Sequence, residues 1–348
     1  EAVNIEQLLL ETAASIDEAM NIANRMGIPP QNFMTGASDG RIGWTLAGRV
    51  PVRSSDYDSR LPVDGATGGG FSGWLAAGDY PRISDPVEGR LWTANSRVVD
   101  GEALAKLGDG GYAHGARSRQ IRDGLRAIEK FAAEDMLRIH LDDRALFLQR
   151  WQALLVELLD AEAVAGKPQR ALYRELVADW HPRASIDSTG YRLVRAFRDE
   201  VHARVFAMLM TPVRKRYPHD VPLRPSRQFE APLWALVREQ PAHMLTANYR
   251  SWRELLLQAL DHTIGEFAGL PGSLRERTWG ERNTASIRHP LSAALPFAAR
   301  WLDMPREPLP GGRDMPRVQG PAFGASERFA VAPGNEAAGY LHMPAGQS

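Results

Sequence analysis

The feature that most constrains the fold of this chain is the spacing of apolar residues between positions 117 and 280. Leucine and tryptophan residues within 146–164 recur at intervals of three and four, and residues 191–216 and 252–267 carry similar stripes. This spacing places the apolar side chains on one face of an α-helix. The middle of the chain is therefore predicted to be a bundle of amphipathic helices.

A β-rich region precedes these helices. Residues 33–35 and 42–47 flank Ser38-Asp39-Gly40, which is the pattern of two strands joined by a glycine-containing hairpin turn. Residues 1–30 indicate two short helices, the second with Ser15 as its N-cap. Strand-like alternation returns in residues 328–331 and 338–343. The predicted fold class is α+β.

These patterns divide the chain into three zones. Residues 1–116 are expected to be β-rich with N-terminal helices, residues 117–280 to be helical, and residues 281–348 to return to core strands.

Composition excludes several classes of function. Lys and Arg together number 42, as do Asp and Glu, so no basic surface for nucleic acid or an anionic membrane is indicated. The absence of cysteine excludes disulfides, thiolate metal ligands and a cysteine nucleophile. No apolar run approaches the ~18 residues of a membrane helix, and no signal peptide is visible at the N-terminus. None of the nine histidines has metal-binding spacing.

The segment from Gly89 to Val99 carries the candidate chemistry. It is predicted to be a strand that ends in Thr-Ala-Asn95, which would hold the asparagine amide where strand gives way to loop. An amide N–H in that place can donate to a developing oxyanion without carrying a charge of its own. From the residues alone, Asn95 could equally satisfy backbone groups of its loop, which is the commoner role of such a residue.

The same segment resembles the oxyanion-asparagine segment of the penicillin acylase family, whose members are N-terminal-nucleophile amidohydrolases. In that family an arginine follows at the same interval and orients the asparagine. The resemblance therefore implies that Asn95 is an oxyanion donor and that Arg117 orients it, with Arg119 as the alternative. Weaker collinear similarities extend over nearly the whole chain, at residues 39–44, 48–53, 279–280 and 289–291.

The resemblance implies part of an αββα N-terminal-nucleophile hydrolase core with a large helical insertion. It identifies the chain as a fragment of the β-subunit portion, truncated at both ends, since the family continues beyond a Gly-Gln-Ser like that of residues 346–348. The implied activity is hydrolysis of the amide bond of N-acyl compounds, such as β-lactam side chains or N-acyl-homoserine lactones, through an acyl-enzyme. The implied partners are the α-subunit and the remainder of the β-subunit from the same precursor. The implied location is periplasmic or secreted.

Two departures from the family pattern limit what can be carried over. The family nucleophile is a serine or another small residue at an N-terminus made by self-cleavage, whereas residue 1 here is Glu. The fragment alone is therefore expected to be inactive. The family offers calcium as a possible metal, but Lys106 occupies the position of an aspartate that binds it in penicillin G acylases and the other ligands are absent, so no cofactor is carried over.

Two alternatives remain beside the amidase hypothesis. Residues 36–40 fit the G-x-S-x-G elbow of α/β-hydrolases, but that elbow needs a helix after its serine, and a strand-like stretch follows Ser38. We therefore expect Ser38 to lie in a hairpin turn. The second alternative, a non-catalytic helical binding module, follows from the amphipathic helices of residues 117–280.

Overall fold

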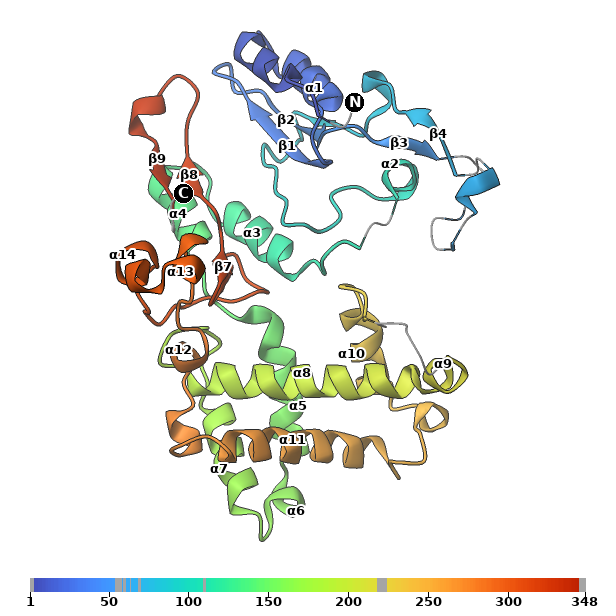
Figure 1. Ribbon diagram of the computed structural model, residues 1–348, viewed down its shortest axis with the longest axis vertical. Coiled ribbons are helices and arrows are strands. Elements are labelled where there is room, and N and C mark those ends of the chain that lie inside the picture. The colour runs from blue at the N-terminus through green and yellow to red at the C-terminus, as the bar shows by residue number, and fades with distance from the viewer. Residues whose placement is uncertain are drawn as a thin grey trace. The chain divides into compact units, whose positions relative to one another are not determined.

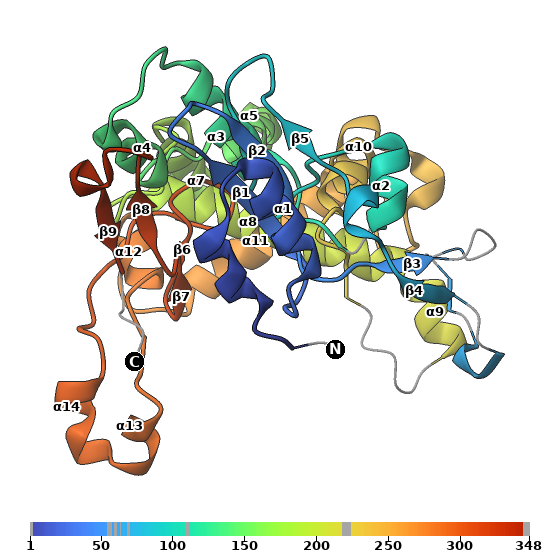
Figure 2. The same ribbon diagram turned by 90° about the horizontal axis from the view of Figure 1, so that it is seen from above.

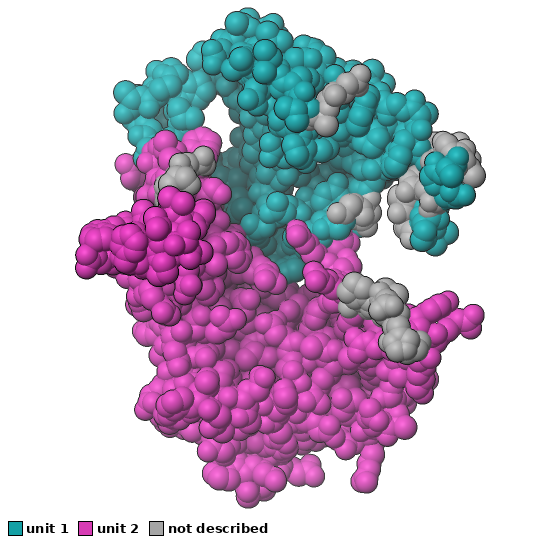
Figure 3. Space-filling model, in the orientation of Figure 1, with its two compact units in different colours: residues 1–133, 330–340 teal, residues 134–329, 341–348 magenta. Residues whose placement is uncertain are grey.

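The structure is a computed structural model that describes residues 3–53, 58, 61–62, 64–67, 70–108, 111–217 and 224–343. The Gly-Gln-Ser of residues 346–348 lies outside these ranges. The chain divides into two compact units (Figure 3). The first comprises Glu1–Ala133 with Ala330–Tyr340, and the second comprises Glu134–Phe329 with Leu341–Ser348. The three-zone division stays a prediction.

The first unit is built around a three-stranded antiparallel sheet covered by a helix. Strands β1 (Gln31–Gly36), β2 (Ile42–Ala47) and β5 (Ile83–Ser84) lie in the order β1-β2-β5. Helix α1 (Ile16–Arg25) packs on β2, as Figures 1 and 2 show. Ala23 of α1 and Ala47 of β2 are both buried in this contact.

Local sequence explains the start of α1 and the hairpin. The Ser15 hydroxyl accepts from the Glu18 amide at 3.2 Å, and the Glu18 carboxylate accepts from the Ala14 amide at 2.9 Å. The first bond satisfies an amide that the first helical turn leaves without a partner, and the second ties the residue before the N-cap to that turn. In the β1–β2 turn, Gly40 has a φ of 91°, which glycine adopts without steric cost. The predicted helix and hairpin are both confirmed.

The remaining elements of the first unit are short. They are η1 (Glu6–Thr12), β3 (Pro51–Arg53), η2 (Gly65–Thr67), β4 (Phe71–Trp74), η3 (Ala77–Asp79), α2 (Gly101–Leu107), α3 (Ala116–Arg126) and η8 (Glu336–Ala338). Strands β3 and β4 pair with each other in a separate two-stranded ribbon.

The second unit is helical. Its helices are α4 (Ala133–His140), η4 (Leu146–Leu148), α5 (Gln149–Leu158), α6 (Ala161–Val164), α7 (Pro168–Ala178), α8 (Thr189–Leu209), α9 (Thr211–Arg216), α10 (Glu230–Glu239), η5 (Ala242–Met244), α11 (Trp252–Ala268), η6 (Leu274–Glu276), α12 (Trp279–Arg282), α13 (Leu291–Ala294), η7 (Pro296–Ala298) and α14 (Ala299–Leu302). Strands β6 (Gln319–Gly320) and β7 (Phe323–Gly324) form a small ribbon in this unit. Strand β8 (Arg328–Ala330) pairs with β9 (Tyr340–His342), and each of these two strands has residues in both units.

Helix α8 lies at the centre of this unit and packs against α5, α7 and α11 (Figure 1). Its Phe197 and Val201 are fully buried together with Trp151 of α5 and Leu255 of α11. The apolar stripes read from the sequence are thus the faces that form the core. The fold is mixed α+β, mostly helical with small sheets, in agreement with the predicted class.

The strand predicted to lead to Asn95 is absent, and that prediction is wrong. Residues 85–100 are all described, and they form turns and irregular backbone. Gly89 has a φ of 61° and Asn95 a φ of 59°, so the chain changes direction at both positions instead of extending. Asparagine tolerates this left-handed conformation better than most residues. Residues 90–94 are half-buried in this loop.

Candidate active site

Asn95 and Arg117 are in direct contact within the first unit. Arg117 lies in the first turn of α3, and its Nη2 donates to Asn95 Oδ1 at 2.7 Å. The same nitrogen donates to the backbone oxygen of Ala94 at 3.0 Å. Arg117 thus binds both the side chain of Asn95 and the peptide group that precedes it.

This contact fixes which end of the Asn95 amide can act as a donor. A guanidinium group has only donors, so the atom that faces it must be the amide oxygen. Within the described residues, no protein group accepts a hydrogen bond from Asn95 Nδ2, and the side chain is exposed. The NH₂ group is therefore available to an incoming acceptor.

Further hydrogen bonds hold the Asn95 loop along α3. The Ala113 amide, just before the helix, donates to Asn95 O at 2.9 Å. Near the other end of the helix, Arg126 binds both carboxylate oxygens of Glu88, at 2.8 and 2.5 Å. The Arg126 guanidinium lowers the pKa of Glu88, so this carboxylate remains charged at neutral pH. These bonds connect the loop that carries Asn95 to both ends of α3.

Arg119 does not share this contact. Its side chain is exposed and its Nε lies 3.8 Å from Asp123 Oδ2, one turn further along α3. Residues 117 and 119 point in different directions because helical side chains two positions apart do not share a face. Of the two arginines, Arg117 is the one that touches Asn95.

Two hydroxyl groups that flank Asn95 were not singled out in the sequence. Thr93 Oγ1 and Ser96 Oγ are both buried and have no hydrogen-bond partner among the described residues. An unsatisfied buried hydroxyl costs about 1–3 kcal/mol. Nothing in the sequence distinguishes these residues from the many other serines and threonines, since their burial depends on how the loop is folded.

Lys106 lies on α2 of the same unit and carries a positive charge where the family resemblance would place a metal-binding carboxylate. Its Nζ donates to Asp79 O at 3.3 Å, and its backbone oxygen accepts from Arg53 Nη1 at 3.0 Å. In the part of the chain that the structure describes, no three His, Asp or Glu residues are grouped as metal ligands would be.

Ser38 lies in the turn between β1 and β2. The Gly40 amide donates to Ala37 O at 3.0 Å, and strand β2 follows directly. The strand-to-helix geometry of a nucleophile elbow is therefore absent at this serine, as expected.

Comparison with known proteins identifies the family. The penicillin amidase family model matches residues 5–348, so the chain belongs to that family. It is 29% identical over 337 residues to penicillin acylase 2 proenzyme of Pseudomonas sp. (strain SE83), a match that covers 93% of this chain and 41% of that protein. It is also 28% identical over 209 residues to acyl-homoserine lactone acylase QuiP of Pseudomonas aeruginosa, covering 57% of this chain and 24% of that protein. The chain thus spans less than half the length of these curated relatives.

A solved structure shares the fold. The thermostable penicillin G acylase from Alcaligenes faecalis superimposes with a TM-score of 0.55 at 17% sequence identity, over 78% of this chain and 52% of that one. No helix within the described residues combines the length and the apolar character needed to cross a membrane.

Proposed function

We propose that this chain is part of the β-subunit portion of an amidase that hydrolyses the linear amide bond of N-acyl compounds through an acyl-enzyme. Its first unit would contribute to a layered αββα core, and its helical unit would be the insertion. Membership of the penicillin amidase family supports the reaction class. The names of the two relatives support an acyl group drawn from penicillins or from acyl-homoserine lactones.

The observation that carries the proposal is the Arg117–Asn95 contact. An oxyanion donor must aim an N–H at the place where negative charge develops, and its orientation must be set before the reaction. The 2.7 Å bond from Arg117 holds Asn95 Oδ1 against the guanidinium group and leaves Nδ2 unbonded within the described residues. An asparagine that only served its own loop would need no such orientation.

The proposed mechanism assigns the nucleophile to a part of the whole protein outside these 348 residues. Its hydroxyl or other small nucleophilic group attacks the amide carbonyl, and its own α-amino group takes the proton. Asn95 Nδ2 donates to the tetrahedral oxyanion. The protonated α-amino group gives its proton to the leaving nitrogen as the intermediate collapses, which releases the amine and leaves an acyl-enzyme. Water then hydrolyses the acyl-enzyme to the carboxylic acid and restores the nucleophile.

The whole protein would contain an α-subunit and the remainder of the β-subunit, made from one precursor. It would act in the periplasm or outside the cell. No metal takes part in the proposed steps, and neither nucleic acid nor membrane is a proposed partner.

The test is an assay of the whole protein with two probe substrates, a phenylacetyl amide and N-octanoyl-homoserine lactone. The proposal expects equal release of amine and carboxylate from at least one of them, and capture of the acyl group by added hydroxylamine as the hydroxamate. Failure to hydrolyse either class, or hydrolysis without a trappable acyl-enzyme, would contradict it.

A further inference from the structure

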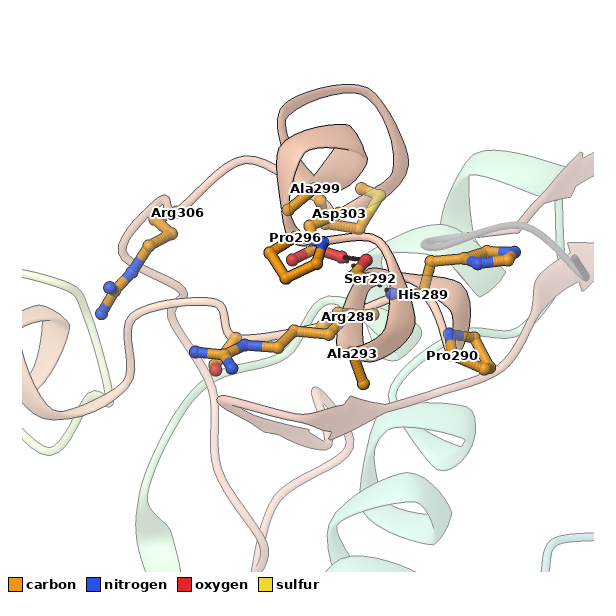
Figure 4. A pocket seen from close by; sticks show the side chains of 12 residues that line it. Arg288, His289, Pro290, Ser292, Ala293, Pro296, Ala299, Asp303 and Arg306 are labelled. Atoms are coloured by element: carbon orange, nitrogen blue, oxygen red, sulfur yellow. Dashed lines mark hydrogen bonds between the residues drawn. The ribbon is translucent and has the colours of Figure 1, made fainter.

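The second unit contains a pocket of about 640 Å³ that one continuous stretch of chain builds (Figure 4). This stretch, residues 286–306, includes α13, η7 and α14. The residues that line the pocket are Ser286, Ile287, Arg288, His289, Pro290, Ser292, Ala293, Pro296, Ala299, Asp303, Met304 and Arg306. Its volume lies in the range of about 300–1,000 Å³ that is usual for small-molecule sites.

Hydrogen bonds across the base of the stretch hold the pocket in shape. The Met304 amide donates to Ile287 O at 3.1 Å, and the His289 amide donates to Asp303 Oδ1 at 3.0 Å. The Ser292 hydroxyl also donates to Asp303. The bond from Ser292 lowers the pKa of Asp303 more than any other interaction does, so the Asp303 carboxylate is charged at neutral pH. Its hydrogen bonds connect the beginning of the stretch, at His289 and Ser292, to the end of the stretch.

Two arginines give the pocket a positive side. In Figure 4 the side chains of Arg288 and Arg306 extend to one side of the pocket and that of His289 to the other. Both arginines are exposed and neither forms an ion pair among the described residues, while the charge of Arg288 also acts on the nearby Asp303. Arg300 is the only other basic residue of the stretch apart from His289, and Asp303 is its single acidic residue. The positive charge is therefore in excess.

The rest of the lining includes an apolar wall. Pro290, Ala293, Pro296, Ala299 and Met304 form this wall, beside the polar Ser286, His289, Ser292 and Asp303. An apolar wall beside a few placed polar groups is the usual composition of a site for a compound that has an apolar body and one charged end. A highly charged anion such as a polyphosphate would gain nothing from the wall and would be repelled by Asp303 more strongly than a single carboxylate.

We propose that this pocket binds a small carboxylate with an apolar body, its carboxylate facing Arg288 and Arg306 and its body against the apolar wall. A planar guanidinium matches a carboxylate in geometry as well as charge. Both arylacetates and medium-chain fatty acids have this chemistry. The inference is independent of the proposed function, since it uses none of the residues around Asn95.

The test is an NMR titration of the 348-residue chain with carboxyl-labelled phenylacetate and, separately, octanoate. Saturable binding of one equivalent by about 10 mM is expected for at least one, an affinity within reach of a small ligand. The neutral analogue phenylacetamide should bind at least about tenfold more weakly than phenylacetate, because it forms no charge-assisted pair. Inorganic phosphate should not displace the carboxylate.

Matched variants locate the site. The double variant Arg288→Gln/Arg306→Gln should weaken binding about tenfold or more. Arg300→Gln should leave it unchanged, because Arg300 stacks 3.8 Å over the Trp301 ring and does not line the pocket. Asn95→Ala should also leave it unchanged, which separates this pocket from the proposed active site. Circular dichroism confirms that each variant is folded.

Several outcomes would overturn the inference. These are a lack of saturable binding by both acids, equal binding of phenylacetamide, displacement by phosphate, or an equal loss in Arg300→Gln. Loss of binding in Asn95→Ala would move the site to the other unit. The comparison of phenylacetate with phenylacetamide needs no variant, so the inference stays testable even if the double variant fails to fold.

Discussion

Asn95 combines an exposed amide with a backbone conformation that few residues adopt readily. Its φ of 59° lies in the left-handed region, and Arg117 donates a hydrogen bond to its amide oxygen. Alanine at this position would lose the donor and would strain the left-handed backbone. The effect of a substitution must therefore be separated into a catalytic part and a structural part.

Replacing Asn95 by Ala in the whole enzyme is expected to lower kcat by about 10²–10³-fold, the usual loss for one oxyanion donor, with a smaller change in KM. Steady-state kinetics on a phenylacetyl amide measure both constants. Asn95→Gly is the matched control, since glycine tolerates the positive φ but also lacks the donor. Equal losses in the two variants would assign the effect to the missing amide, whereas an unchanged kcat would return Asn95 to a structural role.

Arg117 is expected to act by positioning Asn95. Arg117→Ala should lower kcat by roughly 10–100-fold, because the amide is then free to rotate away from the reacting carbonyl. Arg117→Lys should restore little, since one ammonium cannot reproduce the geometry of the planar guanidinium. Arg119→Ala, on the same helix but paired with Asp123, is the control and should retain wild-type kcat. If both alanine variants lose activity equally, α3 is merely destabilised and the positioning role fails.

At the scale of elements, Glu230 joins three helices of the second unit. This carboxylate on α10 is 4% exposed and accepts from Trp151 Nε1 of α5 at 2.9 Å. It also accepts from Arg198 Nε of α8 at 3.0 Å and from Arg150 of α5. A buried charge is tolerated when its lone pairs are satisfied in this way, and removing one partner leaves the others unpaired.

Glu230→Ala is therefore expected to destabilise the helical unit by about 3–5 kcal/mol, because two arginines lose their shared buried partner. Glu157→Ala is the control, since Glu157 is exposed and pairs with Arg238 at 3.3 Å. That surface pair should contribute about 1 kcal/mol or less. Urea unfolding followed by circular dichroism measures the free energy of unfolding of each variant. Similar values for the two variants would contradict the prediction that Glu230 stabilises the contact between α5, α8 and α10.

At the scale of the whole molecule, the proposed chemistry requires more than these residues supply. The chain holds the proposed oxyanion donor, the nucleophile is proposed to lie outside it, and the chain covers 41% of its penicillin acylase relative. A donor alone stabilises a charge that never forms. The helical unit has its own buried core and does not depend on that chemistry to fold.

The 348-residue chain by itself is therefore expected to hydrolyse no N-acyl amide. Release of amine from a phenylacetyl amide should equal the buffer blank, while the whole protein turns the same substrate over. Turnover by the isolated chain well above the blank, and lost on replacing a residue within it, would show that the nucleophile has been misassigned.

The sequence by itself determined the elements whose signals are local. Ser15 specifies the start of α1, Gly40 permits the β1–β2 turn, and the apolar stripe of residues 252–267 becomes the buried face of α11, because caps, turns and periodicity act over a few residues. The tertiary structure decided what depends on distant partners. It replaced the strand predicted before Asn95 with a loop. It also brought Arg117, and not Arg119, into contact with Asn95 and placed Glu230 between two arginines. A strand needs a neighbour to pair with and a hydrogen bond needs its acceptor in reach, and neither condition is encoded in the segment itself.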